Sequence, residues 1–134
     1  MSAMDDVETV RAAYEAFERG DRDGALAAIA DDVVWEQAQG LAHGGVYHGL
    51  AAVKENVFGP LTRDWWERFS APADELLSAP PHVVAIGRYQ GVAKGTGRVL
   101  DVPFVHVWTF EGGKAVRFRQ YLDTAGWNQA LTSS

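Results

Sequence analysis

A long run of alternating, aromatic-rich sequence constrains the fold of this chain more than any other feature. It extends from Arg98 to Tyr121, and the Gly112-Gly113 pair interrupts it. Two alternating runs that flank a glycine turn are typical of an antiparallel β-hairpin. The sequence therefore predicts that the two halves of this stretch pair as neighbouring strands of a sheet.

The length of the turn decides which side chains of the hairpin face each other. A two-residue turn would place His106 opposite Arg119 and so mix charge into an apolar face. A three-residue loop that ends at Gly113 places His106 opposite Phe118 and uses the glycine in the left-handed region. A slip of one residue moves every side chain to the other face, so we favour the three-residue loop. The face it predicts carries Phe104, His106, Trp108, Val116, Phe118, Gln120 and Leu122.

Composition bounds the class of protein. The chain has 134 residues, 47% of them hydrophobic, and we expect a single domain over residues 1–134. It has no cysteine, which excludes disulfides and thiolate metal sites and is in keeping with a cytoplasmic location. A net charge of −6 without a basic stripe disfavours nucleic acid as a partner. No apolar run approaches the roughly 18 residues of a membrane span, and no secretory signal is visible, so we expect no membrane association.

The remaining elements are predicted from the spacing of their apolar residues. Residues 5–19 have helical spacing, and Asp21 can cap a second short helix that reaches Ile29. We further expect a strand over 33–38, a helix over 50–58 that Gly59-Pro60 ends, strands over 69–78 and 83–92, and a last helix capped by Asp123. Helices followed by a run of antiparallel strands predict an α+β fold.

Three stretches of the chain resemble a known family. AYEAFERGDRDGALAAIADDVVWE, YHGLAAV and HVWTFEGGKAVRFRQYLD resemble the SnoaL-like branch of the nuclear transport factor 2-like superfamily. That superfamily includes ketosteroid isomerases, polyketide cyclases, limonene epoxide hydrolases and scytalone dehydratase. The resemblance implies a cystatin-like conical barrel, with N-terminal helices packed on a strongly bent, mostly antiparallel sheet. It also implies a deep pocket for a small hydrophobic molecule, and a homodimer.

The same resemblance assigns roles to four side chains. Tyr14 matches the tyrosine with which ketosteroid isomerases donate a hydrogen bond to an oxyanion, and His106 matches the histidine of polyketide cyclases. Gln37 stands where the isomerases keep a carboxylate base. Gln120 stands where cyclases and epoxide hydrolases keep an aspartate. Because neutral amides cannot act as bases at neutral pH, no relative's mechanism carries over complete.

The chemistry of these four residues leaves alternatives open. A buried, neutral His106 could accept a proton from an acidic C–H bond or from water, or it could merely satisfy a hydrogen bond in the core. Tyr14 could donate to a ligand oxygen or pack in the core. Gln37 and Gln120 could orient a substrate, or they could bond to each other.

Further residues are candidates for the wall of a pocket. The aromatic and aliphatic candidates are Trp35, Phe104, Trp108, Phe118 and Leu122. Arg88 could bind a substrate carboxylate, or it could be a surface arginine. Asp123 reads better as a helix cap than as an acid of the site. His43 and His48 are too few to hold a metal ion, so we expect no metal site.

Two functions from different classes follow from these residues. The first is a cofactor-free isomerase, cyclase or dehydratase that uses acid–base chemistry on a carbonyl-bearing polyketide, steroid or terpenoid-like substrate. The second is a ligand-binding or structural homodimer without catalysis, which the missing carboxylates favour. An epoxide hydrolase is a weaker alternative, because the aspartates that would activate water are absent.

Overall fold

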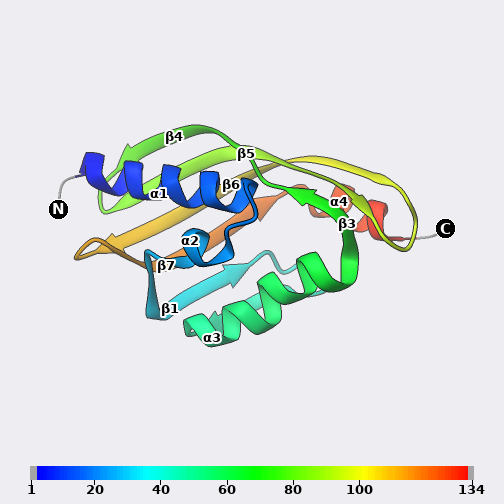
Figure 1. Ribbon diagram of the computed structural model, residues 1–134, viewed down its shortest axis with the longest axis horizontal. Helices are drawn as coiled ribbons and strands as arrows, with labels where there is room; N and C mark the ends of the chain where they lie inside the picture. Colours follow the sequence, from blue (N-terminus) through cyan, green and yellow to red (C-terminus); the bar gives the residue numbers. More distant parts are fainter. Residues whose placement is uncertain (1–2, 133–134) are drawn as a thin grey trace.

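A computed structural model describes residues 3–132, so residues 1, 2, 133 and 134 of the expected domain lie outside the described part. The chain folds into helices that cross one face of a curved, open sheet (Figure 1). In chain order the elements are α1 (Ala3–Glu18), α2 (Arg22–Leu26), β1 (Ile29–Gln37), β2 (Gly45–His48), α3 (Leu50–Val53), η1 (Lys54–Phe58), η2 (Leu61–Trp65), β3 (Trp66–Ser70), β4 (Ala73–Ala79), β5 (His82–Ala93), β6 (Val99–Glu111), β7 (Lys114–Leu122) and α4 (Thr124–Leu131).

The described strands form one sheet in the order β2-β1-β7-β6-β5-β3, and β4 pairs with β5 outside this path. β1 and β7 run parallel, while the other neighbours are antiparallel. The predicted α+β class with a mostly antiparallel sheet is confirmed. In the described part of the chain, no helix is long and apolar enough to cross a membrane.

The central hairpin forms, but with a different turn from the predicted one. Gly112 and Gly113 both have positive φ, 58° and 80°, as a two-residue type I′ turn requires. A bulge then leaves Val116 without a partner strand residue, because Phe110 pairs with Ala115 while Thr109 pairs with Arg117. The predicted three-residue loop was therefore wrong.

The bulge nevertheless restores the predicted face of the hairpin. It shifts the register by one residue, so that His106 stands opposite Gln120, and not opposite Phe118 or Arg119. Every predicted inward side chain except Val116 keeps its facing, and Ala115 is buried in its place. An extra residue in one strand is a common way to re-aim side chains in a sheet.

Three other predicted boundaries differ from the structure. Ile29 belongs to strand β1 and not to the second helix, and Asp31 and Asp32 are exposed residues of that strand. The predicted strand over 69–78 is two strands, separated at Ala71-Pro72, as expected for a residue pair that cannot continue a ladder.

The helix after Gly49 does not end at Gly59-Pro60. Both residues keep right-handed helical angles, φ −57°, ψ −55° and φ −63°, ψ −33°, and the backbone remains helical from residue 50 to residue 65. The turns on either side are of the wide π type, which occur as local insertions in helices. We attribute the tolerance of the proline ring to this wider backbone.

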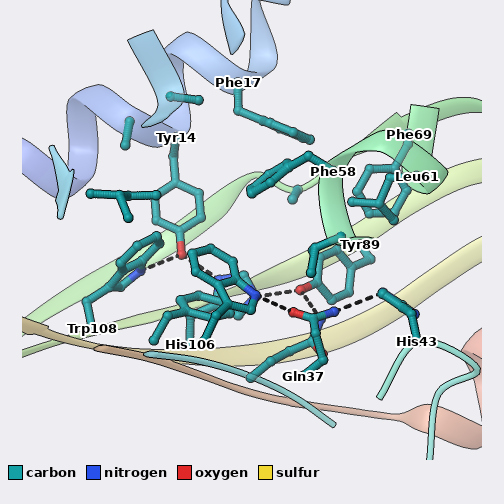
Figure 2. A pocket seen from close by; sticks show the side chains of 18 of the residues that line it. Tyr14, Phe17, Gln37, His43, Phe58, Leu61, Phe69, Tyr89, His106 and Trp108 are labelled. Atoms are coloured by element: carbon teal, nitrogen blue, oxygen red, sulfur yellow. Dashed lines mark hydrogen bonds between the residues drawn. The ribbon is translucent and has the colours of Figure 1, made fainter. Parts of the chain in front are cut away.

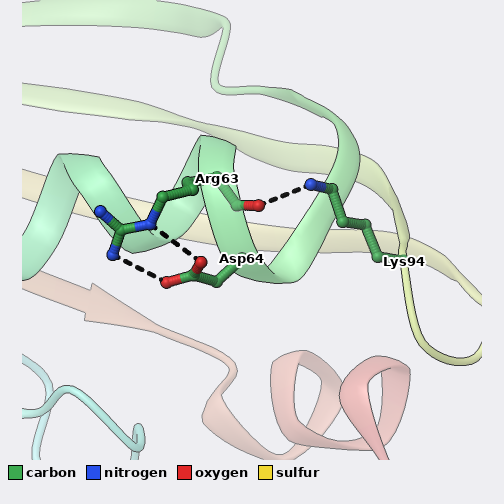
Figure 3. Close-up of polar contacts among 3 residues, drawn as sticks. All are labelled: Arg63, Asp64 and Lys94. Atoms are coloured by element: carbon green, nitrogen blue, oxygen red, sulfur yellow. Dashed lines mark hydrogen bonds and ion pairs between the residues drawn. The ribbon is translucent and has the colours of Figure 1, made fainter.

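The end of this helical run is fixed to the loop that joins β5 to β6. The Lys94 ammonium donates to the backbone carbonyl of Arg63 at 2.6 Å (Figure 3). The Lys94 backbone N–H donates to the backbone carbonyl of Trp65 at 2.9 Å. The exposed Arg63 guanidinium pairs with Asp64 through two contacts of 2.9 Å. A lysine that bonds the last carbonyls of a helix satisfies groups that have no partner within it.

The buried core consists of two clusters that meet beneath α1. One gathers Val33, Trp35 and Phe118 with their neighbours, and the other is built around Trp66 and Trp127. Tyr14 packs against both clusters from α1. The candidate site lies where they meet.

Candidate functional site

An apolar cavity lies between the helices and the inner face of the sheet. Its volume is about 80 Å³, which is room for several waters or for a ring-sized group. The residues that line it are Ala13, Tyr14, Phe17, Ala25, Ile29, Trp35, Gln37, His43, Val57, Phe58, Leu61, Phe69, Ala71, Tyr89, His106, Trp108, Phe118, Gln120 and Trp127. None of these described lining residues is an Asp, Glu, Lys or Arg.

His106 stands at the centre of the cavity wall, between two phenols (Figure 2). The Tyr14 hydroxyl lies 2.5 Å from its Nδ1, and the Tyr89 hydroxyl lies 2.5 Å from its Nε2. The imidazole is 5% exposed. Both ring nitrogens therefore have a partner, and neither faces bulk water.

Each phenol oxygen also accepts a hydrogen bond from a fixed N–H group. The Trp108 indole donates to the Tyr14 oxygen at 3.0 Å, and the Gln120 amide donates to the Tyr89 oxygen at 2.8 Å. The amide is itself oriented, because its Oε1 accepts from the backbone N–H of Ala38 at 3.1 Å. These contacts extend the network along β6 and β7.

These groups are positioned by the alternation of side chains between the two faces of the sheet. His106 pairs with Ala85 of β5 and with Gln120 of β7, so three adjacent strands present their inner faces together. The Phe104 ring stacks on the imidazole, with centroids 4.0 Å apart and planes 12° apart. This stacking holds the ring plane in line with the two hydroxyls.

Burial keeps the central groups neutral. Desolvation lowers the pKa of His106 to about 3 and raises the pKa of the Tyr14 hydroxyl well above its ordinary value. The pKa of Tyr89 is raised for the same reason, although the hydrogen bond from Gln120 opposes the shift. At neutral pH the site therefore holds a neutral imidazole between two neutral phenols.

A second chain of polar groups runs beside the first. The Trp35 indole donates to Gln37 Oε1 at 2.7 Å, which turns the Gln37 Nε2 toward His43 Nε2 at 2.9 Å. Since the amide nitrogen is a donor only, His43 Nε2 accepts, and the proton of this imidazole must be on Nδ1. That Nδ1 is buried and has no hydrogen-bond partner in the described part of the chain. Desolvation lowers the pKa of His43 to about 4.

The structure brings most of the predicted site residues together. The four candidates for chemistry, Tyr14, Gln37, His106 and Gln120, all line the cavity, as do Trp35, Trp108 and Phe118. Gln37 and Gln120 do not bond to each other, because each is held by a different partner.

Three predicted residues lie elsewhere. Phe104 is behind the cavity wall, against His106, and Leu122 lies beyond the cavity at the end of β7. Arg88 points away from the cavity, since it alternates with the inward Tyr89 on β5. It donates to the Asp101 carboxylate at 2.7 Å on the surface. The prediction of Arg88 as a substrate-binding residue is therefore corrected by the alternation of the strand.

Two polar residues that line the cavity, Tyr89 and His43, were not predicted as site residues from the sequence. Tyr89 could have been found from the alternation of Val83, Ala85 and Gly87 with outward residues, which places it on the inner face. His43 lies in the loop between β1 and β2, where no periodicity indicates its facing. His48, its neighbour in sequence, is exposed.

In the described residues, no three His, Cys, Asp or Glu side chains gather to hold an ion.

Asp123 caps α4, with its carboxylate accepting from the Gly126 N–H at 3.0 Å. The prediction of a helix cap at this position is confirmed.

Known proteins share this architecture. An NTF2-like protein of unknown function from Burkholderia pseudomallei K96243 is 36% identical, and the match covers 98% of this chain and 99% of that one, with a TM-score of 0.87. TerC, crystallised with polyporic acid, is 26% identical over 95% and 98%, with a TM-score of 0.84. A candidate polyketide cyclase from Xanthomonas campestris pv. campestris is 25% identical over 98% and 100%, with a TM-score of 0.81.

The comparison with curated proteins gives no match. A family model of the SnoaL-like domain matches residues 10–118, which include all the hydrogen-bonded groups around His106 except Gln120. Together with the NTF2-like neighbours, the match establishes that this chain belongs to the SnoaL-like domain family.

Proposed function

We propose that this chain binds a small, hydrophobic, carbonyl-bearing compound and moves a proton on it without a cofactor, as an isomerase, cyclase or dehydratase. One observation carries the proposal: a neutral imidazole bonded to two neutral phenols lies in the wall of an aromatic cavity. A few placed polar groups in an otherwise apolar pocket are typical of small-molecule sites.

The chemistry of the wall favours a neutral ligand with a hydrogen-bond acceptor. None of the described lining residues is an Asp, Glu, Lys or Arg that could neutralise a charged substrate. Burying an unpaired charge costs several kcal/mol or more. A carbonyl oxygen, by contrast, can accept from a phenol hydroxyl. That hydrogen bond strengthens as negative charge develops on the oxygen, which is how oxyanion donors accelerate enolisation.

Two structural neighbours support this class of ligand. TerC was crystallised with polyporic acid, and the Xanthomonas neighbour is named as a candidate polyketide cyclase. Both names point to oxygenated cyclic or polyketide chemistry. We extend that chemistry to this chain because the cavity is lined by aromatic rings and neutral donors.

Binding without catalysis is the second candidate. It is favoured by the absence of any carboxylate among the described lining residues, because relatives of this type are expected to use one as the base. The same absence weighs against an epoxide hydrolase. His106 by itself is a weak base, since both of its nitrogens are already bonded and its pKa is low.

Thermal shift and turnover measurements test the proposal. We expect fused-ring ketones such as 2-tetralone to raise the melting temperature, because ligands that bind only the folded state stabilise it. A Tyr14→Phe variant should lose most of this shift, whereas Tyr121→Phe on the exposed side of β7 should keep it. If the ketones bind and are released unchanged under all conditions, the non-catalytic candidate is correct. If Tyr14→Phe binds them as well as the wild type, the ligand does not use this site.

We also propose a cytoplasmic homodimer that forms through the outer face of β5 and β6. The outward residues Val84, Ile86, Val105 and Val107 are apolar and only half-buried in the single chain, and they stand in pairs across the two strands. Light scattering after size exclusion should give twice the mass of the 14.6 kDa chain, and Val105→Lys should give a monomer. A monomeric wild-type chain would contradict the proposal.

A further inference from the structure

We propose that Tyr14, His106 and Tyr89 form a proton relay, which takes a proton from carbon at one end and delivers a proton to oxygen at the other. The inference deepens the proposed function and rests on it for the class of substrate. It makes Tyr89 a catalytic residue beside Tyr14, with His106 as the group that couples them.

Counting protons in the network leads to this inference. A neutral imidazole has one N–H and one lone pair, while the two phenols together have two O–H groups. One phenol donates to the imidazole lone pair, and the other accepts from the imidazole N–H. The hydroxyl proton of the second phenol then has no acceptor in the described network. Because both phenols line the cavity, this surplus proton is available to a ligand.

The network has two equivalent arrangements. In the first, Nδ1 carries the imidazole proton, Tyr89 donates to Nε2, and Tyr14 offers its hydroxyl to the ligand. In the second, Nε2 carries the proton, Tyr14 donates to Nδ1, and Tyr89 offers its hydroxyl. The two differ in the positions of the protons along the two contacts of 2.5 Å and in which phenol carries the proton that faces the cavity. Conversion between them needs no movement of a ring.

Conversion from the first arrangement to the second supplies and removes the protons that one enolisation of a ketone requires. The ketone oxygen takes the Tyr14 proton, the proton on Nδ1 moves to Tyr14, and the Tyr89 proton moves to Nε2. The Tyr89 oxygen takes the proton from the carbon next to the carbonyl. The electron pair of that C–H bond becomes the C=C bond, and the C=O π pair becomes the new O–H bond. No net charge and no co-reactant are required.

The surroundings of the two phenols fit this exchange. Whichever oxygen carries partial negative charge during the transfer still accepts an N–H bond, from Trp108 at the Tyr14 end or from Gln120 at the Tyr89 end. Fixed donors in a buried site stabilise developing charge strongly. The relay also explains how a site without a carboxylate could remove a carbon-bound proton, because Tyr89 becomes a base at the moment when its own proton leaves.

Deuterium exchange into 2-tetralone in D₂O, followed by proton NMR, tests the relay. Incubation in D₂O before 2-tetralone is added replaces the O–H and N–H protons of the relay with deuterium, so a catalysed cycle places deuterium on the carbon next to the carbonyl. We expect wild-type protein to exceed the buffer rate, and Tyr14→Phe, Tyr89→Phe and His106→Gln each to lose about 100-fold or more, the range of positioned acid–base groups. Tyr121→Phe makes the same chemical change outside the cavity and should leave the rate unchanged.

The double variant distinguishes a relay from two independent donors. Residues that act as a unit have strongly non-additive effects, so Tyr14→Phe/Tyr89→Phe should be no slower than either single variant. Melting temperatures without ligand check that each variant folds, and exchange rates at saturating 2-tetralone separate a loss of binding from a loss of proton transfer. If Tyr89→Phe retains exchange while Tyr14→Phe loses it, the relay is wrong and the proposed function stands with Tyr14 alone. If wild-type protein binds 2-tetralone without exchange, the proposed catalysis fails, and the role of Tyr89 fails with it.

Nitrogen-15 NMR of histidine-labelled protein decides the proton arrangement without any substrate. A relay that can convert between both arrangements gives Nδ1 and Nε2 of His106 shifts intermediate between protonated and unprotonated nitrogens. A single locked tautomer, or an imidazolium at neutral pH, would overturn the relay. Tyr89→Phe should move both shifts away from the wild-type values, while Tyr121→Phe should not.

Discussion

We expect the free energy of unfolding of this protein to fall steeply as the pH drops below about 6.5, because two buried histidines resist protonation in the folded state. Their ordinary pKa of 6.5 is lowered to about 3 for His106 and to about 4 for His43 by desolvation. Between these values and pH 6.5 the unfolded chain binds protons that the folded chain does not. Stability is therefore complete above about pH 6.5 and is lost toward acid, by about 1.4 kcal/mol per pH unit for each histidine.

Down to pH 4 this loss amounts to about 6 kcal/mol, which is comparable with the whole stability of many domains. Urea unfolding at a series of pH values measures it. His106→Gln should lower stability at pH 7 and reduce the slope against pH by about half, and His43→Gln should do the same. His48→Gln, at an exposed position of β2, is the matched control and should keep the full slope. Equal slopes in all four proteins would show that the two buried histidines are not the cause.

Replacing Gly87 with alanine should destabilise the protein by about 3 kcal/mol, the range of overpacked core positions. A Cβ at Gly87 would lie 2.1 Å from the backbone oxygen of Pro72 and 2.7 Å from the Phe104 ring. The first of these atoms belongs to backbone at the start of β4, which cannot rotate away. The second would push the ring that stacks on His106, so ligand binding should weaken as well.

Gly95→Ala is the control for this substitution. A Cβ there meets no atom within 4 Å, and the residue is exposed in the turn after β5. Its melting temperature should match or slightly exceed that of the wild type, because alanine restricts the unfolded chain. A Gly87→Ala protein with wild-type stability would mean that β4 can move away from β5 at little cost.

Most of the fold could be predicted because each prediction rested on a local signal. Alternation over 98–121 gave the hairpin, helical spacing gave α1, and Asp21 and Asp123 each cap the helix predicted for them. The Gly59-Pro60 prediction was wrong because a rule for ordinary α-helical turns does not apply to the wider π turns that form there.

Site residues could be predicted only where the sequence shows which side of a helix or strand points toward the cavity. Inward facing of Tyr14, Gln37, His106 and Gln120 followed from period and from the family resemblance. Tyr89 was missed because its neighbours Val83, Ala85 and Gly87 carry no polar group that would draw attention to the inner face of β5. The prediction for Arg88 was wrong because the side of β5 on which it lies was not known from the sequence. In the structure Tyr89 faces the cavity, so its neighbour Arg88 faces the other side of the strand.

The sequence by itself determined which residues are apolar, which can turn and which can cap, and these local properties select an α+β fold. Only the tertiary structure decided that a bulge at Val116 would correct the register set by a tight glycine turn. It also placed a loop histidine, His43, beside Gln37. A tyrosine from a third strand, Tyr89, came to lie beside His106. The physical reason is that hydrogen-bond partners far apart in the chain are chosen by the packing of strands across the sheet. No local pattern records that packing.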